Sequence, residues 1–423
     1  MATTHVPLLD DLGWRGLIAQ VAGEERLAEL IAEGGATVYC GFDPTADSLH
    51  VGHLVPLLTL ARYQRAGVRP IALAGGGTGL IGDPSGRVSE RLLNDAGTVN
   101  EWTERIRGQL SSFLDFEGGA VLVDNYDWLK DLSAIGLLRD VGKHFPMGWM
   151  LGKESVRTRL EGDGLSYTEF SYMVLQAYDF LHLERTYGCL AQIGGSDQYG
   201  NITAGIELIR RADGLSAAGQ TVPLITDSSG QKFGKSTGAA VWLDPNRTSP
   251  YVFYQFWLQV DDADAVRYLR LFTFLDRPTI EAIEADHAEH PERREAQRVL
   301  AREMTVMVHG EAEWQRAVEV SEALFGKGRL ADVDPARLEA ALEAAPTVRL
   351  AATDARSFAA LIVETGLAKS TSEAARLASG GGVYANDERV DDVTAAPEAG
   401  QFLGGRVLVL RRGRRSHGLV VRD

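Results

Sequence analysis

The order of strand and helix signals in the N-terminal part constrains the fold of this chain more than any other feature. Residues 36–42 (ATVYCGF) are a short apolar run that predicts a buried strand, and residues 69–77 (RPIALAGGG) are a second one that ends in glycines. Between them, residues 50–67 have the pattern of a helix, with Gly67 as its stop. Strand, helix and strand at this spacing predict a right-handed βαβ unit and therefore a parallel sheet.

Two more apolar runs, at residues 119–125 (GAVLVDN) and 189–195 (CLAQIGG), are separated by helical stretches and extend that sheet. We therefore expect an α/β fold with an open, doubly wound, Rossmann-like domain over about residues 35–225. Sheets of this kind bind their ligands at the carboxyl ends of the strands, so chemistry-bearing residues at those ends become the candidates for a site.

The rest of the chain has a different pattern. From Pro250 to about Phe325 helical periodicity dominates, and from Ser357 a helix, a hairpin and a last strand predict a small α+β unit. The expected division is a Rossmann-like domain at residues 1–228, a loop and helical domain at 229–345, a linker at 346–355 and a small C-terminal domain at 356–423.

Charge and cysteine content exclude several classes of protein. A formal net charge of −15 argues against a protein that coats nucleic acid through its overall field. Two cysteines, Cys40 and Cys189, cannot build a disulfide framework or a four-thiolate zinc site. No run is long and apolar enough for a membrane span, and the first residues do not resemble a secretory signal. We expect a cytoplasmic, reduced protein without a resident metal.

The C-terminal end departs from this acidic balance. From Gln401 onward six arginines stand against one acid, Asp423. An acidic body with a basic end can hold a polyanion at that end, and a merely solvated terminus is the alternative. The arginines are Arg406, Arg411, Arg412, Arg414, Arg415 and Arg422.

A pair of histidines, His50 and His53, stands at the start of the predicted helix with Gly52 between them. Zinc binding would need further ligands, and no Glu completes a His-Glu-x-x-His pattern. Packing in a core is the other alternative. Several possible N-cap residues precede the pair, so both imidazoles and the free N–H groups of the first turn would point at one place. Phosphate is the natural occupant of such a place, and this is the interpretation we favour.

Residues 74–86 (AGGGTGLIGDPSG) contain Gly77-x-Gly79-x-x-Gly82, which formally matches the dinucleotide fingerprint. That fingerprint should open a helix, whereas Asp-Pro-Ser-Gly follows directly and predicts a turn. No Gly-Lys-Ser/Thr closes the segment as in a Walker loop. A glycine-rich loop that lines a nucleotide or amino-acid pocket fits better, with Asp83 as an anchor for an amine; a plain surface turn is the alternative.

Three other segments carry polar side chains in suggestive positions. Residues 230–238 (GQKFGKSTG) place Lys232 and Lys235 in a small-residue loop that could close over a polyphosphate, although a solvated loop is the simpler interpretation. The predicted helix at 167–180 carries a polar stripe that lines either a pocket or solvent, and residues 192–201 (QIGGSDQYGN) follow a strand. The polar residues of these two segments are Tyr172, Gln176 and Asp179, and Asp197 and Gln198.

Taken in order, these segments resemble class I aminoacyl-tRNA synthetases, and most closely the bacterial tyrosyl-tRNA synthetases. The class motif His-Ile-Gly-His appears as residues 50–53 (HVGH), and Lys-Met-Ser-Lys-Ser appears as residues 232–236 (KFGKS) in a variant typical of the tyrosyl branch. The segments YCGFDPTADSLHVGHL, GLIGDPSGR, FSYMVLQAYDF and GGSDQYGNI are also characteristic. The resemblance covers essentially the whole chain, and the C-terminal end looks like an RNA-binding domain shared with a ribosomal protein.

The resemblance implies roles for the residues at matching positions. Tyr39 and Asp179 would bind the substrate phenol, and Asp83, Tyr172 and Gln176 its ammonium group. The residues implied in ATP binding are Gly41, Asp43, Thr45, His50, His53, Asp197 at the ribose, Gln198 and Lys235. Those implied in catalysis at the phosphates are Thr45, His50, His53, Arg87, Arg91, Lys232 and Lys235, and those implied in RNA binding are Arg411, Arg412, Arg414 and Arg415.

Two positions depart from the family pattern. Arg87 stands where family members carry Lys, which keeps the charge and changes its geometry. Pro56 lies inside the helix after His53 and bears on packing beneath the ATP site.

The activity implied by the resemblance is that of a tyrosine–tRNA ligase. L-Tyrosine and ATP, which brings Mg²⁺ with it, would give tyrosyl-adenylate and pyrophosphate, and tRNA(Tyr) would then take the tyrosyl group. Members of the family work as homodimers with one tRNA spanning both subunits, and no membrane partner or tightly bound cofactor is expected. The alternatives are a catalytically weak RNA-binding paralogue, a tryptophanyl enzyme and an NAD-type oxidoreductase.

Overall fold

The computed structural model describes residues 6–85, 93–161, 164–228, 230, 233–236, 239–325, 328–343, 345–351, 353–413 and 416–422. The chain forms two compact units. The first comprises Met1–Asp244 and Val260–Ala296, and the second comprises Pro245–Gln259 and Gln297–Asp423. The domain limits expected from the sequence stay predictions.

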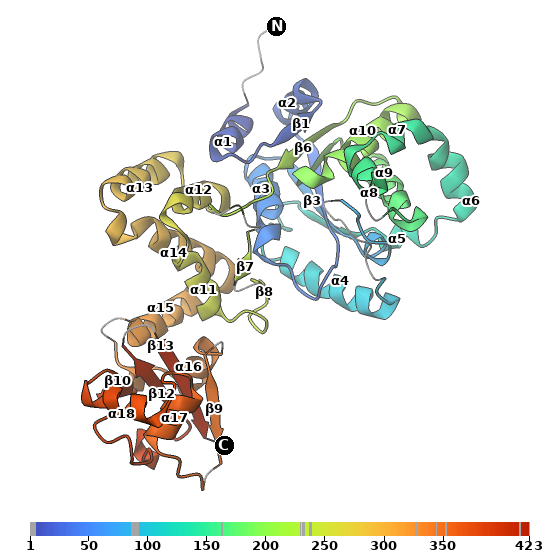
Figure 1. Cartoon of the computed structure of the whole chain (residues 1–423). Helices are drawn as coiled ribbons and strands as arrows, with labels where there is room; N and C mark the ends of the chain where they lie inside the picture. The colour runs from blue at the N-terminus through green and yellow to red at the C-terminus, as the bar shows by residue number, and fades with distance from the viewer. Residues whose placement is uncertain are drawn as a thin grey trace. The chain divides into compact units, whose positions relative to one another are not determined.

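The first unit is built on a six-stranded sheet, drawn in blue to green in Figure 1. The strand order is β1-β6-β5-β2-β3-β4. Its last five strands along the chain are parallel, and β1 is antiparallel to β6. The chain runs outward from β2 to β3 and β4, and then returns to the other side of β2 for β5 and β6. The expected doubly wound parallel sheet is therefore confirmed, and the direction of winding changes between β2 and β5. The strands are β1 (Gln20–Ala22), β2 (Thr37–Phe42), β3 (Arg69–Ala74), β4 (Val121–Asp124), β5 (Ala191–Gly195) and β6 (Ala218–Val222).

Buried side chains fix the sheet against its helices. Tyr39, Ile71 and Leu73 project from β2 and β3 into an apolar cluster with residues of α9 (Tyr167–Tyr187) and α10 (Tyr199–Asp213). The helix α3 (Leu54–Arg65) packs on β2 and β3. The unit also contains α1 (Pro7–Arg15), α2 (Glu24–Glu33), α4 (Ala96–Leu110), α5 (Tyr126–Leu129), α6 (Ala134–Gly136), α7 (Met147–Leu151), α8 (Glu154–Glu161), α12 (Asp262–Phe272) and α13 (Arg277–Glu289).

The second unit joins helices to a smaller sheet of order β11-β10-β12-β13-β9. Its pairs are antiparallel except for the parallel pair β13–β9. Its strands are β9 (Thr347–Leu350), β10 (Val383–Ala385), β11 (Glu388–Arg389), β12 (Val407–Arg412) and β13 (Ser416–Arg422). Its helices are α11 (Pro250–Leu258), α14 (Glu295–His309), α15 (Glu311–Phe325), α16 (Pro335–Ala341), α17 (Phe358–Glu364) and α18 (Thr371–Ser379).

Helices pack against both faces of this smaller sheet. Alternate residues of β12 point to opposite faces, so Leu408 and Leu410 pack with α17 and α18, whereas Val407 and Val409 pack with α15 and α16. Within the described part of the chain, no helix has the length and apolar character needed to cross a bilayer.

Candidate active site

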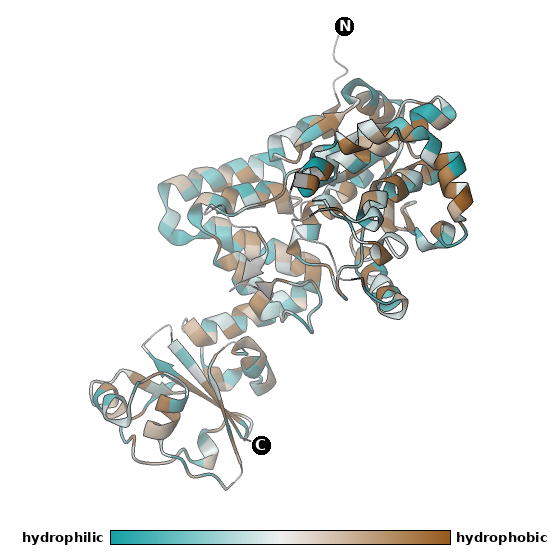
Figure 2. Ribbon diagram, turned by 45° about the vertical axis from the view of Figure 1, so that its right-hand side comes forward, coloured by the Kyte–Doolittle hydropathy of each residue, from teal (hydrophilic) through white to brown (hydrophobic). Residues whose placement is uncertain are grey.

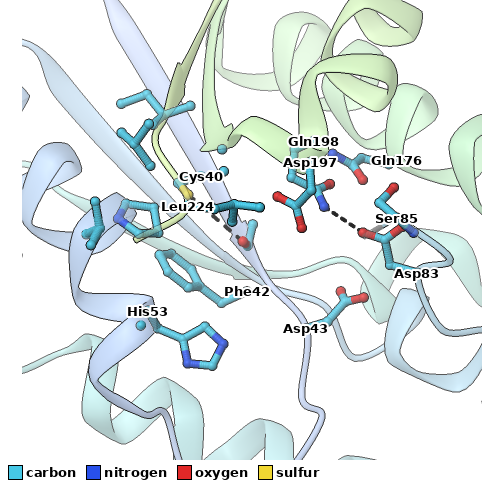
Figure 3. A pocket seen from close by; sticks show the side chains of 18 of the residues that line it. Cys40, Phe42, Asp43, His53, Asp83, Ser85, Gln176, Asp197, Gln198 and Leu224 are labelled. Atoms are coloured by element: carbon cyan, nitrogen blue, oxygen red, sulfur yellow. Dashed lines mark hydrogen bonds between the residues drawn. The ribbon is translucent and has the colours of Figure 1, made fainter. Parts of the chain in front are cut away.

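A cavity of about 340 Å³ opens at the carboxyl ends of β2 and β5, where the winding of the sheet changes direction (Figure 3). The cavity brings together residues that lie far apart in the sequence, from β2, the turn before α3, α9 and the segment after β5. The expected site residues that line it are Tyr39, Gly41, Asp43, Thr45, His50, His53, Asp83, Tyr172, Gln176, Asp179, Asp197 and Gln198.

The side chains of six expected site residues lie outside what the structure describes. Arg87, Arg91 and Lys232 lie outside the described residues, and so do Arg414 and Arg415. Only the backbone of Lys235 is described, in the short strand β7 (Lys235–Ser236), which pairs with β8 (Ala239–Ala240).

One end of the cavity holds Tyr39 and Asp179, both buried. Within the described residues the Tyr39 hydroxyl has no hydrogen-bond partner, although it lies close enough to Asp179 for that carboxylate to raise its pKa further above the value that burial already imposes. Asp179 is held by two donors: Asn125 Nδ2 lies 2.8 Å from Oδ2, and Trp128 Nε1 lies 2.8 Å from Oδ1. Burial raises the pKa of Asp179 to about 8 against the opposing effect of these two hydrogen bonds.

Asn125 and Trp128 were not among the residues expected from the sequence. Asn125 follows β4 directly, so its place at the carboxyl edge of the sheet was a usable signal for a pocket residue. Trp128 lies in the short helix α5 and is stacked on His182 of α9, with ring centroids 4.3 Å apart. No local pattern predicts that contact, because it joins residues from two separate helices.

A second group of polar residues contains two carboxylates. The Tyr172 hydroxyl donates to Asp43 Oδ2 at 2.7 Å. Gln198 Nε2 donates to Asp83 Oδ2 at 2.7 Å, as Figure 3 shows. The other oxygen of Asp43 accepts from Thr78 Oγ1 at 2.7 Å. Two carboxylates with hydroxyl and amide groups around them suit a cationic amine, which needs several acceptors.

Gln176 of the same helix is also fixed by a hydrogen bond. Its Oε1 accepts from Asn201 Nδ2 at 3.0 Å, and Asn201 also donates to Gln198 Oε1 at 3.1 Å. The polar stripe of α9 therefore faces this cavity, and the alternative of a solvent-facing stripe is wrong.

The histidine pair forms the turn that leads into α3. His50 Nδ1 accepts from Gly52 N at 3.0 Å, and His53 Nδ1 accepts from His50 N at 3.1 Å. Because Nδ1 of each ring is an acceptor, the neutral imidazoles carry their proton on Nε2 and can donate from that atom. The rings are stacked with centroids 3.9 Å apart and both line the cavity, so they are not part of a closed core.

The structure explains why residue 52 is a glycine, which the sequence did not show. A Cβ at this position would lie 2.8 Å from Cε1 of His50, which is closer than real side chains approach. Any larger residue would push the His50 ring away from His53, so the glycine is what permits the two rings to stack.

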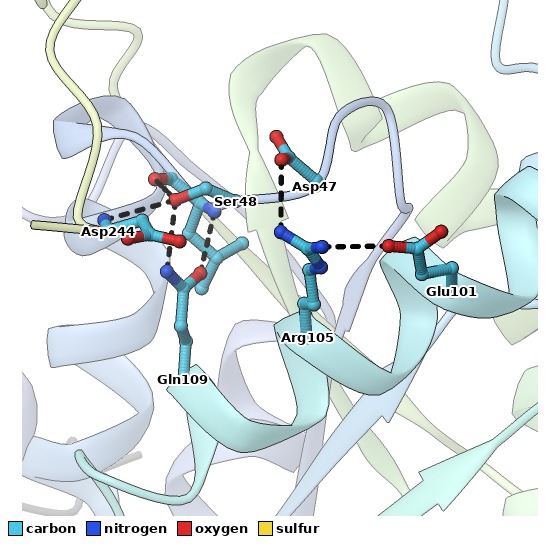
Figure 4. A network of polar contacts seen from close by, with 7 residues as sticks. Asp47, Ser48, Glu101, Arg105, Gln109 and Asp244 are labelled. Atoms are coloured by element: carbon cyan, nitrogen blue, oxygen red, sulfur yellow. Dashed lines mark hydrogen bonds and ion pairs between the residues drawn. The ribbon is translucent and has the colours of Figure 1, made fainter. Parts of the chain in front are cut away.

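A polar network holds the chain just before the histidines (Figure 4). Ser48 Oγ accepts from Gln109 Nε2 at 2.9 Å and from Asp244 N at 3.2 Å, while Leu49 N donates to Gln109 Oε1 at 2.7 Å. On the same side of α4, Arg105 pairs with Asp47 at 3.3 Å. The helix α4 thus fixes the backbone from which His50 projects.

Three glycines after β3 are required by close approach. A Cβ at Gly75, Gly76 or Gly77 would collide with the side chain of Asp43, Asp124 or Leu129 respectively. In the described residues up to Ser85, the chain after them makes a single helical turn, at Thr78–Leu80. The dinucleotide fingerprint, which Gly77, Gly79 and Gly82 match formally, should open a full helix there, so the interpretation as an NAD-binding loop is wrong.

The segment that carries the second motif is held by α12. The Phe233 ring lies 4.8 Å from the ring of Tyr268 and 5.2 Å from that of Phe272. Gly234 has φ +89°, and a Cβ there would lie 2.8 Å from Val51 Cγ2. In addition, Val51 N donates to Val241 O at 3.0 Å. The two motifs that lie far apart in the sequence are therefore in direct contact.

The C-terminal end of α12 is itself fixed to the sheet domain. Arg15 of α1 donates to the carbonyl oxygens of Arg270 and Leu275 at 3.2 and 2.8 Å, and Arg62 of α3 donates to that of Thr273 at 2.5 Å. Cations at the carbonyl end of a helix are favoured by its dipole and by its unpaired carbonyl groups. These contacts make α12 a rigid support for Phe233.

Comparison with known proteins agrees with this geometry. Residues 32–326 match the family described as tRNA synthetases class I (W and Y), and residues 337–420 match the tyrosine–tRNA ligase SYY-like C-terminal domain. The chain is 53% identical to the tyrosine–tRNA ligase of Thermobifida fusca over 428 residues, which cover 98% of this chain and 99% of that protein.

The chain belongs to the class I tyrosyl-tRNA synthetases. It is also 51% identical to the tyrosine–tRNA ligase of Geobacillus stearothermophilus, over 98% of this chain and 99% of that protein. A C-terminally truncated mitochondrial tyrosyl-tRNA synthetase of Aspergillus nidulans has the same fold, with a TM-score of 0.68 and 32% identity over 75% of this chain and 94% of that chain. Membership in the tyrosyl-tRNA synthetases confirms the resemblance drawn from the sequence motifs.

Proposed function

We propose that this protein is a tyrosine–tRNA ligase that activates L-tyrosine with ATP and transfers it to the 3′ end of tRNA(Tyr). The observation that carries the proposal is the buried Tyr39 hydroxyl, which lacks a partner among the described residues and lies beside the buried Asp179. An unsatisfied buried hydroxyl costs about 1–3 kcal/mol, so a ligand that supplies its missing partner is favoured. A phenol supplies one.

Recognition of tyrosine follows from the hydrogen bonds that remain to be made. The substrate hydroxyl would donate to Asp179 and accept from the Tyr39 hydroxyl. Each oxygen of Asp179 already accepts one hydrogen bond and has a lone pair left. Phenylalanine would leave the buried Tyr39 hydroxyl unpaired and would give Asp179 no further hydrogen bond, so the pocket would reject it without a separate editing site. Asp83, Tyr172 and Gln176 would hold the ammonium group.

The first chemical step needs alignment more than a base, because the tyrosine carboxylate is already ionised. One of its oxygens attacks the α-phosphorus of ATP in line, a new P–O bond forms, and the bond to pyrophosphate breaks. The Nε2 protons of His50 and His53 would stabilise the negative charge on the phosphate oxygens as the phosphorus becomes five-coordinate. Thr45 would assist, and Gly41, Asp43, Asp197 and Gln198 would hold the nucleotide.

The leaving pyrophosphate needs positive charge. The lysines Lys232 and Lys235 and the arginines Arg87 and Arg91 would supply it. We propose that Mg²⁺ enters bound to the ATP phosphates and neutralises part of their charge. In the second step a ribose hydroxyl of the terminal adenosine of tRNA attacks the tyrosyl carbonyl carbon, and AMP leaves. We place this reaction in the cytoplasm, where tRNA charging takes place.

An ATP–pyrophosphate exchange assay across amino acids tests the proposal. Purified protein should exchange label between pyrophosphate and ATP with tyrosine and not with phenylalanine or tryptophan. Exchange with tryptophan alone would favour the tryptophanyl alternative. Binding of tRNA without exchange for any amino acid would identify a catalytically weak RNA-binding paralogue, and either result would overturn the assignment.

We also propose that the protein is a homodimer. Large apolar side chains are exposed on the short helices that follow β4 and at the start of α9, with Ile135 73% and Tyr167 74% exposed. Figure 2 shows hydrophobic colouring on the outer helices at the right-hand edge of the first unit. Apolar surface of this kind marks an interface, and a second copy of the chain presents the same surface. The exposed residues are Ile135, Leu138, Met147, Leu151, Leu160 and Tyr167.

Light scattering after size exclusion tests this surface. The double variant Ile135→Glu/Met147→Glu should elute as a monomer, because two charges would be buried without partners in the dimer. Leu215→Glu is the matched control, since Leu215 is an exposed leucine in the loop between α10 and β6. A wild-type protein that is monomeric, or a dimeric double variant, would contradict the proposal.

A further inference from the structure

The sheet of the second unit carries one row of planar side chains across four strands. The register places Arg389 of β11 opposite Tyr384 of β10, Tyr384 opposite Arg411 of β12, and Arg411 opposite His417 of β13. Directly opposed residues in antiparallel strands project from the same face of a sheet. The four side chains therefore lie side by side on one face.

Only part of that face is covered by helices. It is the face from which Val407 and Val409 pack against α15 and α16. The row lies further along the strands: Tyr384 and Arg411 are partly exposed and Arg389 is exposed. At its other end the His417 ring meets Phe325 edge-on, with centroids 5.2 Å apart, and Phe325 is 48% exposed. The uncovered part is thus made of aromatic rings and guanidinium groups.

Tyr384 and Arg411 form the centre of the row. The Arg411 guanidinium carbon lies 4.4 Å from the centroid of the Tyr384 ring, which is a cation–π stack. Such a stack holds the guanidinium plane and the ring in fixed positions. Because both side chains are already ordered, another flat group could stack on them without a further loss of side-chain entropy.

The positive charge of the row is not neutralised. Several arginines of this unit have a carboxylate partner, as Arg406 and Arg349 do with Glu339. In contrast, Arg389 and Arg411 form no ion pair with any residue that the structure describes. The neighbouring acid Glu388 is opposite Ala385, whose side chain lies in the core on the other face of the sheet. No carboxylate therefore belongs to the row itself.

Arg412 shows that sequence position alone does not select the RNA-binding arginines. It projects from the opposite face, and its guanidinium donates to Leu367 O at 2.8 Å and to Glu373 at 3.4 Å. These contacts join β12 to the helices of the domain. Of the two expected RNA-binding arginines that the structure describes, only Arg411 belongs to the row.

We infer that the row Arg389–Tyr384–Arg411 is a stacking site for an unpaired nucleobase of the bound tRNA. Unpaired bases of RNA stack on aromatic rings and on guanidinium planes, and uncompensated arginines beside them attract the phosphates. This inference deepens the proposed function, on which it rests, by naming residues of the C-terminal domain that hold the tRNA.

Affinity for a tRNA(Tyr) transcript, measured with the full-length protein, tests the inference. Tyr384→Ala should raise the Kd by about 5-fold or more, the loss expected for one base stack, and Tyr384→Phe should restore it because the ring alone is needed. Arg411→Lys keeps the positive charge but removes the planar guanidinium group, so it should also raise the Kd. The control Arg406→Ala removes one arginine of the same domain that is paired with Glu339 and should have little effect.

Two further measurements separate stacking from other roles. The dependence of Kd on salt should keep its slope in Tyr384→Ala and become shallower in Arg389→Ala, because only the second variant loses a phosphate contact. Ultraviolet crosslinking should attach a nucleotide to the peptide that contains Tyr384. Wild-type affinity in Tyr384→Ala, or equal losses in Tyr384→Ala and Tyr384→Phe, would overturn the inference. ATP–pyrophosphate exchange with tyrosine should be normal in every variant, so failure of the ligase assignment would be seen separately.

Discussion

At the scale of single residues, the site depends on where protons sit. Both imidazoles of the histidine turn accept a backbone N–H at Nδ1, which leaves Nε2 as the donor. At the phenol end, a buried carboxyl and a buried hydroxyl lie together without a complete set of partners. Both arrangements are set by the backbone and by burial. Substitutions of single side chains should therefore have separable effects on reaction rate, substrate affinity and stability.

The first prediction concerns His50. The variant His50→Ala removes one Nε2 donor that would act mainly when the α-phosphorus is five-coordinate. We expect the rate of tyrosyl-adenylate formation to fall about 100-fold, the order found when one transition-state donor is lost. The Kd for tyrosine should stay near that of the wild type. Single-turnover kinetics with tyrosine titration measure both, and a loss confined to tyrosine affinity would place His50 elsewhere.

The second prediction concerns the pH dependence of stability through Asp179. Burial in the folded protein raises its pKa to about 8, from an ordinary value of 3.8. Between these values the folded state holds a proton that the unfolded state has released, so the free energy of unfolding falls as pH rises from about 4 to about 8 and levels off above. Asp179→Asn lacks this effect.

Urea unfolding of the wild type and Asp179→Asn, without ligand, at several pH values checks this sign. The stability of the variant relative to the wild type should increase by at least about 1 kcal/mol across that range. A difference between the two proteins that is constant with pH would mean that Asp179 is ionised throughout.

At the scale of elements, the support for the KFGKS segment is the feature with the clearest mechanical role. Phe233 rests on Tyr268 and Phe272 of α12, and Arg15 and Arg62 hold the carbonyl end of that helix. The segment that carries the lysines is therefore attached to the same unit that carries the histidines. We expect α12 to set where the lysines meet the pyrophosphate.

The third prediction follows from this support. Tyr268→Ala should lower the rate of adenylate formation about 2- to 10-fold, since an aromatic pair contributes about 0.5–1.5 kcal/mol. The Kd for tyrosine should not change, because Tyr268 does not line the cavity. Tyr268→Phe keeps the ring and should behave as the wild type. If Tyr268→Phe were as slow as Tyr268→Ala, the ring contact with Phe233 would not be the cause.

The sequence predicted the elements better than it predicted their contacts. The strand, helix and strand at β2, α3 and β3 were visible because apolar periodicity and a glycine stop are local signals. Asn125 and Trp128 were missed because their role depends on α9, which is distant in the chain. For the same reason the glycines after β3 were attributed to ligand approach, whereas the structure shows that neighbouring side chains also exclude a Cβ there.

At the scale of the whole molecule, catalysis and RNA binding are assigned to different units. All described residues that line the cavity belong to the first unit, and the row with Tyr384 and Arg411 belongs to the second. A cut directly after Ala355 would remove β13, to which β9 is paired, and would expose the apolar side of α16. A cut after Phe325 removes the sheet and α16 together.

The fourth prediction uses that cut. A protein that ends at Phe325 should keep ATP–pyrophosphate exchange with tyrosine, because the cavity and its supports remain. Charging of tRNA(Tyr) at low tRNA concentration should fall at least about tenfold, as expected when several phosphate contacts are lost. Parallel exchange and charging assays measure the two steps. Comparable losses in both would show that the C-terminal residues are needed for folding of the catalytic unit.

The hydrogen-bonded group around Asp179 has a consequence for how amino-acid preference could change during evolution. Asn125, Trp128 and Asp179 form one set of donors and acceptors, so an apolar replacement of any one of the three leaves another member without its hydrogen bond. A shift toward a substrate without a hydroxyl would require coordinated replacement of several codons. A single-nucleotide change in the gene is therefore not enough to redirect this pocket to such a substrate and cause mistranslation.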